Sequence, residues 1–498
     1  MNLNKLAALI SLSLVSVTAH SAVLPKVQSD STWFQDSAQL VEQKANQTSQ
    51  TKAKNVILFV GDGMGISTLT AARIYQGQQQ NGNQGGEENL LSFEKFNHTA
   101  LVKTYNTNQQ TPDSAGTMTA IATGVKSKAG VISVSDTALR GNCLSSQGNE
   151  LISLVDLANA KGLSTGVVST ARITHATPAA TYSHTPERDW ESDSNLTEEA
   201  RQNGCTDIAY QMVMRDRDNA LTVALGGGRK NFLPNSVTDG ENKTGAREDG
   251  LDLTQAWMDN FDNAAYVWNQ DEFDAIDVAN TDHLLGLFNA SHMEYELDRA
   301  NDVGGEPSLT EMTQKSIEIL NKNDQGYLLI VESGRIDHGH HAGNAKRALA
   351  DTVELSNAVQ AAYDNTNPDE TLILVTADHS HVFTIAGYPK RGNPILGLVH
   401  GVDGSVTTAL DGKPYTTLGY TNGPGAIVAS RDDLSSVDTQ DNDFMQQSLI
   451  PMGSETHAGE DISLHATGPG SNLVQGVIEQ SVIFHIINQA QQLGGTKY

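Results

Sequence analysis

Five short apolar runs rich in β-branched residues, separated by stretches with a helical pattern, most constrain the fold of this 498-residue chain. Runs of this length without polar alternation are typical of strands that are buried on both faces of a sheet. Strands that alternate with helices indicate βαβ units, so we predict an α/β fold around a mostly parallel sheet. The runs are residues 55–60, 163–169, 221–225, 327–331 and 371–376, and the clearest helical patterns are 150–161, 309–321 and 344–362.

Polar residues stand where four of these strands would end, and several are of metal-ligand type. Because ligands bind outside the carboxyl ends of the strands in open parallel sheets, we expect these residues to converge at one edge. One carboxylate after one strand is usually structural, whereas four such strand ends indicate a metal site. In chain order the residues are Asp62, then Arg172, His175 and Thr177, then Glu332, then Asp378 and His379.

A His-rich segment and a further block extend this set. Within residues 332–341, Asp337 and His341 are four apart, close enough to share a metal if the segment enters a helical turn. His457 lies in the block at 455–461. Imidazole and carboxylate ligands suit zinc. Each block alone also fits an ordinary solvated loop, and only their combination with the strand ends indicates a metal centre.

Ser114, in the segment TPDSA (111–115), is a weak signal alone, since Pro and Asp before a serine are typical of a turn. A serine hydroxyl needs a base or a metal before it acts as a nucleophile. The surrounding residues lack the Gly-x-Ser-x-Gly pattern of serine hydrolases. A metal is therefore the favoured activator of Ser114.

The N-terminus has the order of a secretory signal peptide: Lys5, an apolar run at 6–17, then small residues near Ser21. The run is about 12 residues long, too short to span a membrane comfortably, and a buried helix is the alternative reading. We predict a signal peptide over 1–21, a mature domain over 22–498, and a periplasmic or secreted protein. The polar C-terminus lacks the hydrophobic tail of a lipid-anchor signal, so no membrane anchor is expected.

Charge and cysteine content narrow the function classes further. The chain has 32 Lys and Arg against 59 Asp and Glu, a formal charge of −27. Such a surface repels polyanions, so no nucleic-acid partner is expected. In an oxidising compartment the two cysteines, Cys143 and Cys205, are expected to form one disulfide, with two buried free thiols as the alternative.

Taken together, these blocks resemble the signature segments of alkaline phosphatases, in that family's order and with similar spacing. The resemblance extends from about residue 31 to the end and is strongest for the animal-type branch, which has His at the positions of His175 and His338. The segments are GDGMG (61–65), PDSA (112–115), THATPA (174–179), ESGRIDHGHH (332–341), TADHSHVF (376–383) and ETHAGED (455–461).

The resemblance implies a phosphomonoesterase that acts through a phosphoserine at Ser114, with two zinc ions and one magnesium ion. It also implies that Arg188 binds phosphate, that His338 contacts phosphate indirectly, and that Cys143 pairs with Cys205. The implied ligands are Asp337, His341 and His457 for the first zinc, Asp62, Ser114, Asp378 and His379 for the second, and Asp62, Thr177 and Glu332, with His175 beside them, for magnesium.

The same resemblance implies a three-layer α/β/α sandwich, a homodimer, and a crown-like insert at about 382–454 over the dimer. Its substrates would be small phosphate monoesters, and the physiological one is not readable from the sequence. One departure concerns the animal-type calcium site, which uses a Phe-Glu pair where this chain has Phe288-Asn289. Glu306 is a nearby oxygen donor, yet calcium is not expected.

Three further histidines and three other protein classes fit the sequence less well. His340, His381 and His465 lie near the blocks but match no ligand position, and we expect structural roles for them. A sulfatase would need Pro and Arg where Gly116 and Met118 stand. A phosphodiesterase remains an alternative, as does a secreted metal-binding protein without catalysis, although every ligand position and the nucleophile are filled.

Overall fold

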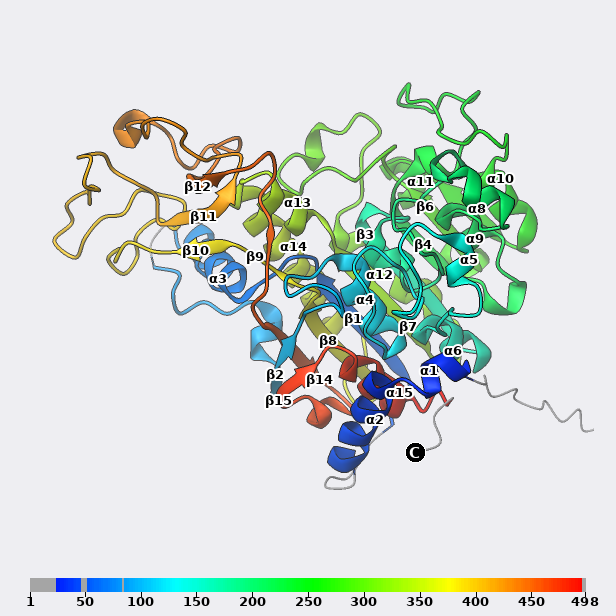
Figure 1. Ribbon diagram of the computed structural model, residues 1–498. Helices are drawn as coiled ribbons and strands as arrows, with labels where there is room; N and C mark the ends of the chain where they lie inside the picture. The colour runs from blue at the N-terminus through cyan, green and yellow to red at the C-terminus, as the bar shows by residue number, and fades with distance from the viewer. Residues whose placement is uncertain (1–23, 46–51, 83–84, 495–498) are drawn as a thin grey trace, which may run out of the picture.

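A ten-stranded sheet forms the centre of the computed structural model, which describes residues 24–45, 52–82 and 85–494 (Figure 1). The predicted signal peptide at 1–21 lies outside these residues. In order across the sheet the strands are β15 (Gly476–Glu479), β2 (His98–Lys103), β14 (Ile462–Thr467), β8 (Thr371–Ala377), β1 (Asn55–Gly61), β7 (Tyr327–Ser333), β3 (Ser164–Arg172), β4 (Val223–Gly227), β6 (His283–Leu287) and β5 (Ala264–Val267).

The sheet is mostly parallel, as predicted, and all five apolar runs contribute strands to it. Only β14 runs antiparallel to its neighbours, β2 and β8. The four strands that precede the candidate ligands, β8, β1, β7 and β3, are consecutive in the sheet. Gly61 at the end of β1 is in register with Ser333 of β7 and Ala377 of β8, so these strands end at the same edge.

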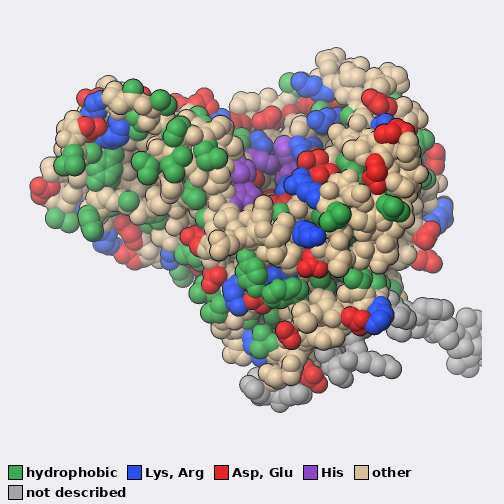
Figure 2. Space-filling model, in the orientation of Figure 1, with side chains coloured by type: hydrophobic (Ala, Val, Ile, Leu, Met, Phe, Trp, Pro, Cys, Tyr) green, Lys and Arg blue, Asp and Glu red, His purple; other side chains and the backbone are tan. Residues whose placement is uncertain are grey.

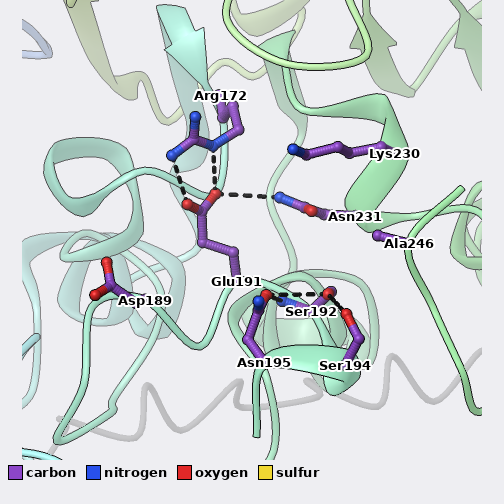
Figure 3. A pocket seen from close by; sticks show the side chains of 9 residues that line it. All are labelled: Arg172, Asp189, Glu191, Ser192, Ser194, Asn195, Lys230, Asn231 and Ala246. Carbon is purple, nitrogen blue, oxygen red and sulfur yellow. Dashed lines mark hydrogen bonds and ion pairs between the residues drawn. The ribbon is translucent and has the colours of Figure 1, made fainter. Parts of the chain in front are cut away.

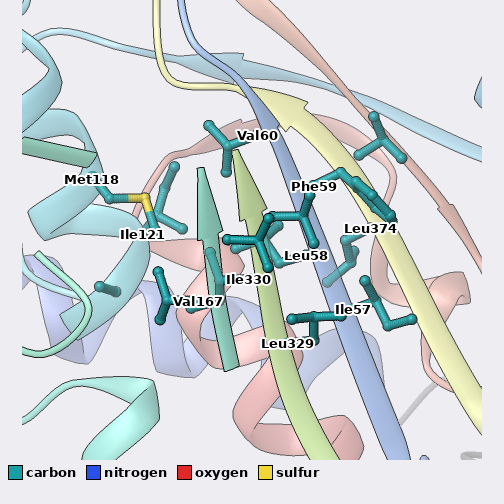
Figure 4. Packing of buried hydrophobic residues seen from close by; sticks show 14 of the residues in the cluster. Ile57, Leu58, Phe59, Val60, Met118, Ile121, Val167, Leu329, Ile330 and Leu374 are labelled. Atoms are coloured by element: carbon teal, nitrogen blue, oxygen red, sulfur yellow. The ribbon is translucent and has the colours of Figure 1, made fainter. Parts of the chain in front are cut away.

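Two groups of helices cover the sheet. α3 (Ile66–Gln80), α12 (Leu309–Leu320) and α14 (Ala345–Asp364) pack together, while α2 (Thr32–Ala45) and α4 (Ser114–Thr123) pack against α15 (Val482–Gln491). Because β1 contacts both α14 and α15, the sheet lies between the two groups, which confirms the α/β sandwich. Figure 4 shows Ile57, Leu58, Phe59 and Val60 of β1 within this core, all fully buried.

Shorter helices connect the strands, and one polar segment is partly helical. The Gln-, Asn- and Gly-rich composition of residues 76–89 is typical of a surface loop, yet α3 continues to Gln80. The Gln78 amide is buried and bonds the backbone of Asn393 and Ile395. The shorter helices are α1 (Lys26–Ser29), α5 (Cys143–Ser146), α6 (Leu154–Ala160), α7 (Ala176–Ala179), α8 (Glu198–Gln202), α9 (Ile208–Val213), α10 (Leu253–Asn260), α11 (Gln270–Asp274) and α13 (Arg335–His341).

Residues 382–454, which we call the insert, project from the main body at the left of Figure 1. They hold a three-stranded sheet of β10 (Phe383–Ile385), β11 (Leu418–Gly423) and β12 (Ser448–Pro451). Below it, β9 (Ser380–His381) pairs with β13 (His457–Ala458). This pairing brings the chain on both sides of the insert back to the ligand-bearing edge of the main sheet.

Candidate metal and phosphate site

Ser114 is the first residue of α4 and is only 2% exposed. Asp113 caps this helix, since its side chain accepts a hydrogen bond from the Gly116 backbone at 3.1 Å. The Ser114 Oγ lies 3.1 Å from His379 Nε2 and 3.5 Å from Asp62 Oδ1. A helix N-terminus favours negative charge, so this position suits an ionised serine or a bound phosphoryl group.

Asp62, Asp378 and His379 form one group of metal-type side chains beside Ser114. His379 Nε2 lies 3.3 Å from Asp62 Oδ1 and 3.3 Å from Asp378 Oδ2. The Gly63 backbone and the Thr117 hydroxyl donate to Asp378 at 3.0 and 3.2 Å. Burial, together with nearby carboxylates, raises the pKa of Asp62 well above its usual value. Carboxylates crowded in this way are stabilised by a cation.

Asp337, His341 and His457 converge in a second place. His341 Nε2 and His457 Nε2 each lie 3.3 Å from Asp337 Oδ1. Burial alone would raise the pKa of Asp337, but the surrounding histidines hold it well below its usual value. The predicted helical turn exists as α13, which places Asp337 and His341 on one face.

The hydrogen bonds of these two histidines show how their rings are prepared for a metal. His341 Nδ1 lies 2.6 Å from the Glu455 carbonyl, and His457 Nδ1 lies 2.8 Å from the Pro112 carbonyl. A carbonyl only accepts, so both Nδ1 atoms carry the proton and both neutral rings present an Nε2 lone pair. The two Nε2 atoms lie 3.1 Å apart. Two facing lone pairs repel unless a cation or a proton lies near both.

His381 joins this place, although the sequence reasoning assigned it only a structural role. Its Nε2 lies 2.8 Å from Asp337 Oδ1 and its Nδ1 lies 2.5 Å from Glu455 Oε2. Burial alone would lower the pKa of His381, but Glu455 and Asp337 raise it to about 9. His381 reaches this place because β9 pairs with β13, which sets His381 opposite His457. A single sequence does not reveal such a pairing.

The other two histidines near the motifs lie outside the metal-type groups found among the described residues. His340 is bonded on both ring nitrogens, at 2.9 Å to the Thr68 hydroxyl and at 2.9 Å to the Tyr420 hydroxyl. His465 lies in β14, with Nε2 3.1 Å from the Ser463 hydroxyl. Both have the surroundings of structural histidines.

Asp62, His175 and Glu332 form a third group, which shares Asp62 with the group beside Ser114. The Thr177 hydroxyl lies 3.5 Å from Asp62 Oδ2. Burial raises the pKa of Glu332 to about 7, and the Ser169 hydroxyl donates to its Oε2. Glu332 Oε1 is buried and has no hydrogen-bond partner among the described residues. A buried, unshared carboxylate oxygen fits a cation bound between these side chains.

Arg188 is positioned beside Ser114 by two side chains. Its Nη1 donates to Asp113 Oδ2 at 3.1 Å, and its Nη2 lies 3.2 Å from His175 Nε2. Asp113 is fixed in turn by the backbone of Gly116 and, at 2.8 Å, of Gly130. Asp113 therefore links the cap of α4 to the guanidinium, a role that sequence reasoning missed.

His338 lies at the margin of the site rather than within a metal-type group. Its ring centre is 5.7 Å from that of His175 and 4.0 Å from that of His292. His338 Nδ1 lies 3.2 Å from Arg335 Nη1. His292, which lies in none of the motif segments, also contacts Arg172, with Nε2 2.5 Å from the guanidinium Nη1. Figure 2 shows histidines gathered in a hollow with Lys and Arg side chains beside them.

Two further predictions concern the disulfide and the position of the animal-type calcium site. Cys143 and Cys205 form the predicted disulfide. At the position of the animal-type calcium site, the Asn289 amide nitrogen donates to Glu306 Oε1 at 2.9 Å, and the Asn289 Oδ1 accepts from the Ser291 backbone at 3.0 Å. The metal-type groups found in the described part of the chain do not include Glu306.

No helix among the described residues is long and apolar enough to cross a membrane.

Comparisons with known proteins show the family of the chain. A family model described as alkaline phosphatase matches residues 53–493. The chain is 44% identical to the tissue-nonspecific alkaline phosphatases of Gallus gallus, over 97% of this chain and 93% of that protein, and of Homo sapiens, over 95% and 91%. It is 42% identical to an alkaline phosphatase of Gadus morhua, over 95% of this chain and 99% of that protein.

Solved structures support the fold. The alkaline phosphatase of Thermus thermophilus aligns with a TM-score of 0.64 at 23% identity, over 91% of this chain and 94% of that chain. The alkaline phosphatase of the Antarctic bacterium TAB5 aligns with a TM-score of 0.60 at 22% identity, over 89% and 99%. Full-length similarity at this level, together with the converging strand ends, identifies the chain as a member of the alkaline phosphatase family and its activity as that of a phosphomonoesterase.

Proposed function

We propose that the chain hydrolyses phosphate monoesters through a covalent phosphoserine on Ser114. The observation that carries this proposal is the place of the Ser114 Oγ, 3.1 Å from His379 Nε2 and 3.5 Å from Asp62 Oδ1. It is buried at the start of α4, beside the Arg188 guanidinium that Asp113 and His175 hold. A phosphoryl group bound there would meet a nucleophile on one side and a bidentate donor on the other.

Two zinc ions and one magnesium ion fit the donor sets. Imidazole lone pairs beside a carboxylate are typical of zinc, and an oxygen-rich set is typical of magnesium. When bound, the ions would supply Lewis-acid stabilisation of the Ser114 and leaving-group oxygens. The proposed ligands are Asp337, His341 and His457 for one zinc, Asp62, Ser114, Asp378 and His379 for the other, and Asp62, Thr177 and Glu332, with His175 beside them, for magnesium. We propose no calcium at Asn289, because its amide nitrogen faces Glu306.

The charge balance supports this metal content. Asp62, Glu332, Asp337 and Asp378 bring four negative charges into the site. Two zinc ions and one magnesium ion would bring six positive charges, and an ionised Ser114 lowers the sum to +1. Arg188 raises it to +2, which complements a phosphate dianion despite the acidic surface of the protein.

The reaction would take two displacements at phosphorus. The Ser114 oxygen attacks phosphorus, and the ester oxygen leaves as an alcohol after it gains a proton from solvent. Water then attacks the phosphoserine, releasing phosphate and restoring the Ser114 hydroxyl. Arg188 would donate to two non-bridging oxygens throughout, a contact that favours monoesters because a diester has one fewer such oxygen.

Assembly and location are also proposals. We propose a homodimer in which the insert forms a crown over the dimer, and export to the periplasm or medium by the segment 1–21. Apolar side chains exposed on the insert support an interface there: Leu410 is fully exposed, and Val428 and Leu449 are 87% and 76% exposed. Exposed apolar side chains gathered in one region are typical of protein contact surfaces.

Replacement of Ser114 by Ala tests the covalent route. We expect hydrolysis of p-nitrophenyl phosphate to fall at least about a thousandfold, because the nucleophile is lost. Zinc and magnesium content, measured by mass spectrometry of the purified protein, should stay near the wild-type value. Wild-type protein quenched in acid with phosphate should carry a phosphoryl group on the peptide containing Ser114. Unchanged turnover in the variant would refute the phosphoserine, and a matched rate on aryl diesters would favour a diesterase.

A further inference from the structure

A polar cavity of about 280 Å³ lies beside Arg172, at the end of β3 (Figure 3). Its walls come from four stretches of the chain that the fold brings together, and its lining is rich in hydroxyl, amide and charged groups. The lining residues are Arg172, Asp189, Glu191, Ser192, Ser194, Asn195, Lys230, Asn231 and Ala246.

The walls are held in place by strong contacts. Arg172 donates to both oxygens of Glu191, at 2.6 and 2.7 Å, so this pair is internally neutral. The Asn231 amide also donates to Glu191 at 3.1 Å. The hydroxyls of Ser192 and Ser194 lie 2.7 Å apart. A cavity with walls bonded to one another is preorganised, so a ligand would lose little binding energy to reordering them.

Lys230 is the exception within this bonded network. Its backbone is fixed, since its N–H donates to the Ala290 carbonyl at 3.2 Å and its carbonyl accepts from the Ala246 backbone at 2.7 Å. Its ammonium makes no hydrogen bond or ion pair with any described residue, and Figure 3 shows the side chain extending toward the cavity. A half-buried ammonium without a partner is a ready binding group for an anion.

The cavity adjoins the phosphate site through a continuous chain of side chains. The Arg188 guanidinium contacts His175, whose ring centre is 5.4 Å from that of His292. His292 in turn contacts the Arg172 guanidinium that forms the cavity wall. The backbone also connects the two places, because the loop that carries Arg188 continues directly into Asp189 and Glu191 of the lining. Because Ser114 and Arg188 are not among the lining residues, a substrate that contacts both places must carry its second anionic group several bonds away from the reacting phosphate.

We propose that this cavity is a second substrate subsite, which binds an additional anionic group on a polyhydroxylated phosphate monoester. The inference rests on the proposed place of the reacting phosphate at Ser114 and Arg188. Lys230 binds the second anion, while the hydroxyls and amides of Ser194 and Asn195 contact the sugar. The subsite selects sugar bisphosphates over the corresponding monophosphates.

Two carboxylates in the lining do not contradict this charge preference. Glu191 is neutralised by Arg172, as described above. Asp189 is 76% exposed, so solvent screens its charge, while the Arg140 guanidinium 3.6 Å away is bonded to both oxygens of Glu187. Among the described residues that line this cavity, Lys230 is therefore the cation that makes no ion pair, since Arg172 is paired with Glu191.

The test compares two substrates that differ by one phosphate. Fructose 1,6-bisphosphate and fructose 6-phosphate are hydrolysed by the wild-type protein and by Lys230→Gln, at low salt and with p-nitrophenyl phosphate as a reference. We expect Lys230→Gln to lower kcat/KM for the bisphosphate about two- to fivefold, mainly through KM, because a partly exposed ion pair is worth little more. The effect should fade as salt rises. Rates on the other two substrates should stay near those of the wild type.

A matched control removes the same charge elsewhere. Lys243 is exposed and lies outside this cavity, so Lys243→Gln should leave the preference for bisphosphate unchanged. Equal losses in both variants, or an equal loss on both sugars in Lys230→Gln, would overturn the subsite. A wild-type protein that fails to hydrolyse p-nitrophenyl phosphate at all would instead refute the proposed function.

Discussion

The ligand-bearing edge of the main sheet buries charged side chains, whereas the insert exposes large apolar ones. At the edge, Asp62, Glu332 and Asp378 are fully buried, although carboxylates normally face solvent. In the insert, Leu410 and Leu449 face solvent, although large apolar side chains are normally buried. Each arrangement is unfavourable by itself, so each indicates a partner of complementary chemistry: cations for the edge, another protein surface for the insert.

Removal of metal should produce the largest effect and act on the edge alone. We expect EDTA treatment to lower p-nitrophenyl phosphate hydrolysis at least about a hundredfold, since buried carboxylates and facing imidazoles would lose their counter-ions. The melting temperature should fall as well, because metal binds only the folded state. Zinc with magnesium should restore both. Oligomeric mass, followed by light scattering, should not change. Full activity in a preparation shown by mass spectrometry to be metal-free would contradict the edge assignment.

Polar substitution in the insert should have the next largest effect and act on assembly. Leu449→Ser combined with Leu410→Ser removes apolar area worth several kcal/mol over the two copies, so the dimer dissociation constant should rise about a hundredfold or more. Analytical ultracentrifugation over a concentration series measures this. Val303→Ser is the control, since Val303 is 90% exposed but lies outside the insert. A wild-type monomer would refute the dimer, and an unchanged constant in the double variant would move the interface elsewhere.

Two aspartates, one in the main body and one in the insert, should differ in a smaller effect, the change of protein stability with pH. Burial raises the pKa of Asp351, in α14, to about 8. Between about pH 4 and pH 8 the unfolded chain releases this proton while the folded protein keeps it, so stability falls as pH rises. Asp351→Asn removes this contribution, and relative to the wild type its unfolding free energy should increase by about 1–3 kcal/mol from pH 5 to pH 8. Urea unfolding at several pH values measures the difference.

Asp411, in the insert, is the control for this prediction. It is exposed and paired with Arg431 at 2.6 Å, and bonding to Arg431 holds the pKa of Asp411 below its usual value. Both states are therefore ionised above about pH 5, and Asp411→Asn should shift the stability profile without changing its slope. Parallel profiles for Asp351→Asn and the wild type would show that Asp351 stays ionised in the folded protein.

The edge was predictable because its residues follow their strands directly in the chain. Asp62 comes immediately after β1, and Asp378 and His379 immediately after β8, so the parallel register alone brings them together. Strands buried on both faces leave apolar runs that a single sequence displays. The sequence therefore sufficed for the central strands and for most of the residues that converge there.

The features that the sequence did not predict depend on contacts between segments that are distant in the chain. His381 enters the site through β9, which pairs with a segment beyond the insert, and a sequence does not specify such pairing. Asp113 looked like an ordinary turn residue because its partner, Arg188, is 75 positions away. The helix α3 extends into a Gln-rich segment because tertiary bonds of Gln78 override local composition.

The disulfide lowers the entropy cost of ordering one of the segments that form the site. Cys143 and Cys205, 62 positions apart, enclose β3, His175, Thr177 and Arg188 in one covalent loop. Closing a loop of this length removes conformational entropy from the unfolded chain worth about 4 kcal/mol. Of the residues proposed to hold magnesium and phosphate, His175, Thr177 and Arg188 thus belong to the segment whose ordering the cross-link makes less costly, while Asp62, Ser114 and Glu332 lie outside it. A reduced chain keeps every ligand but must order this segment against its full entropy, so oxidation and site formation are thermodynamically coupled.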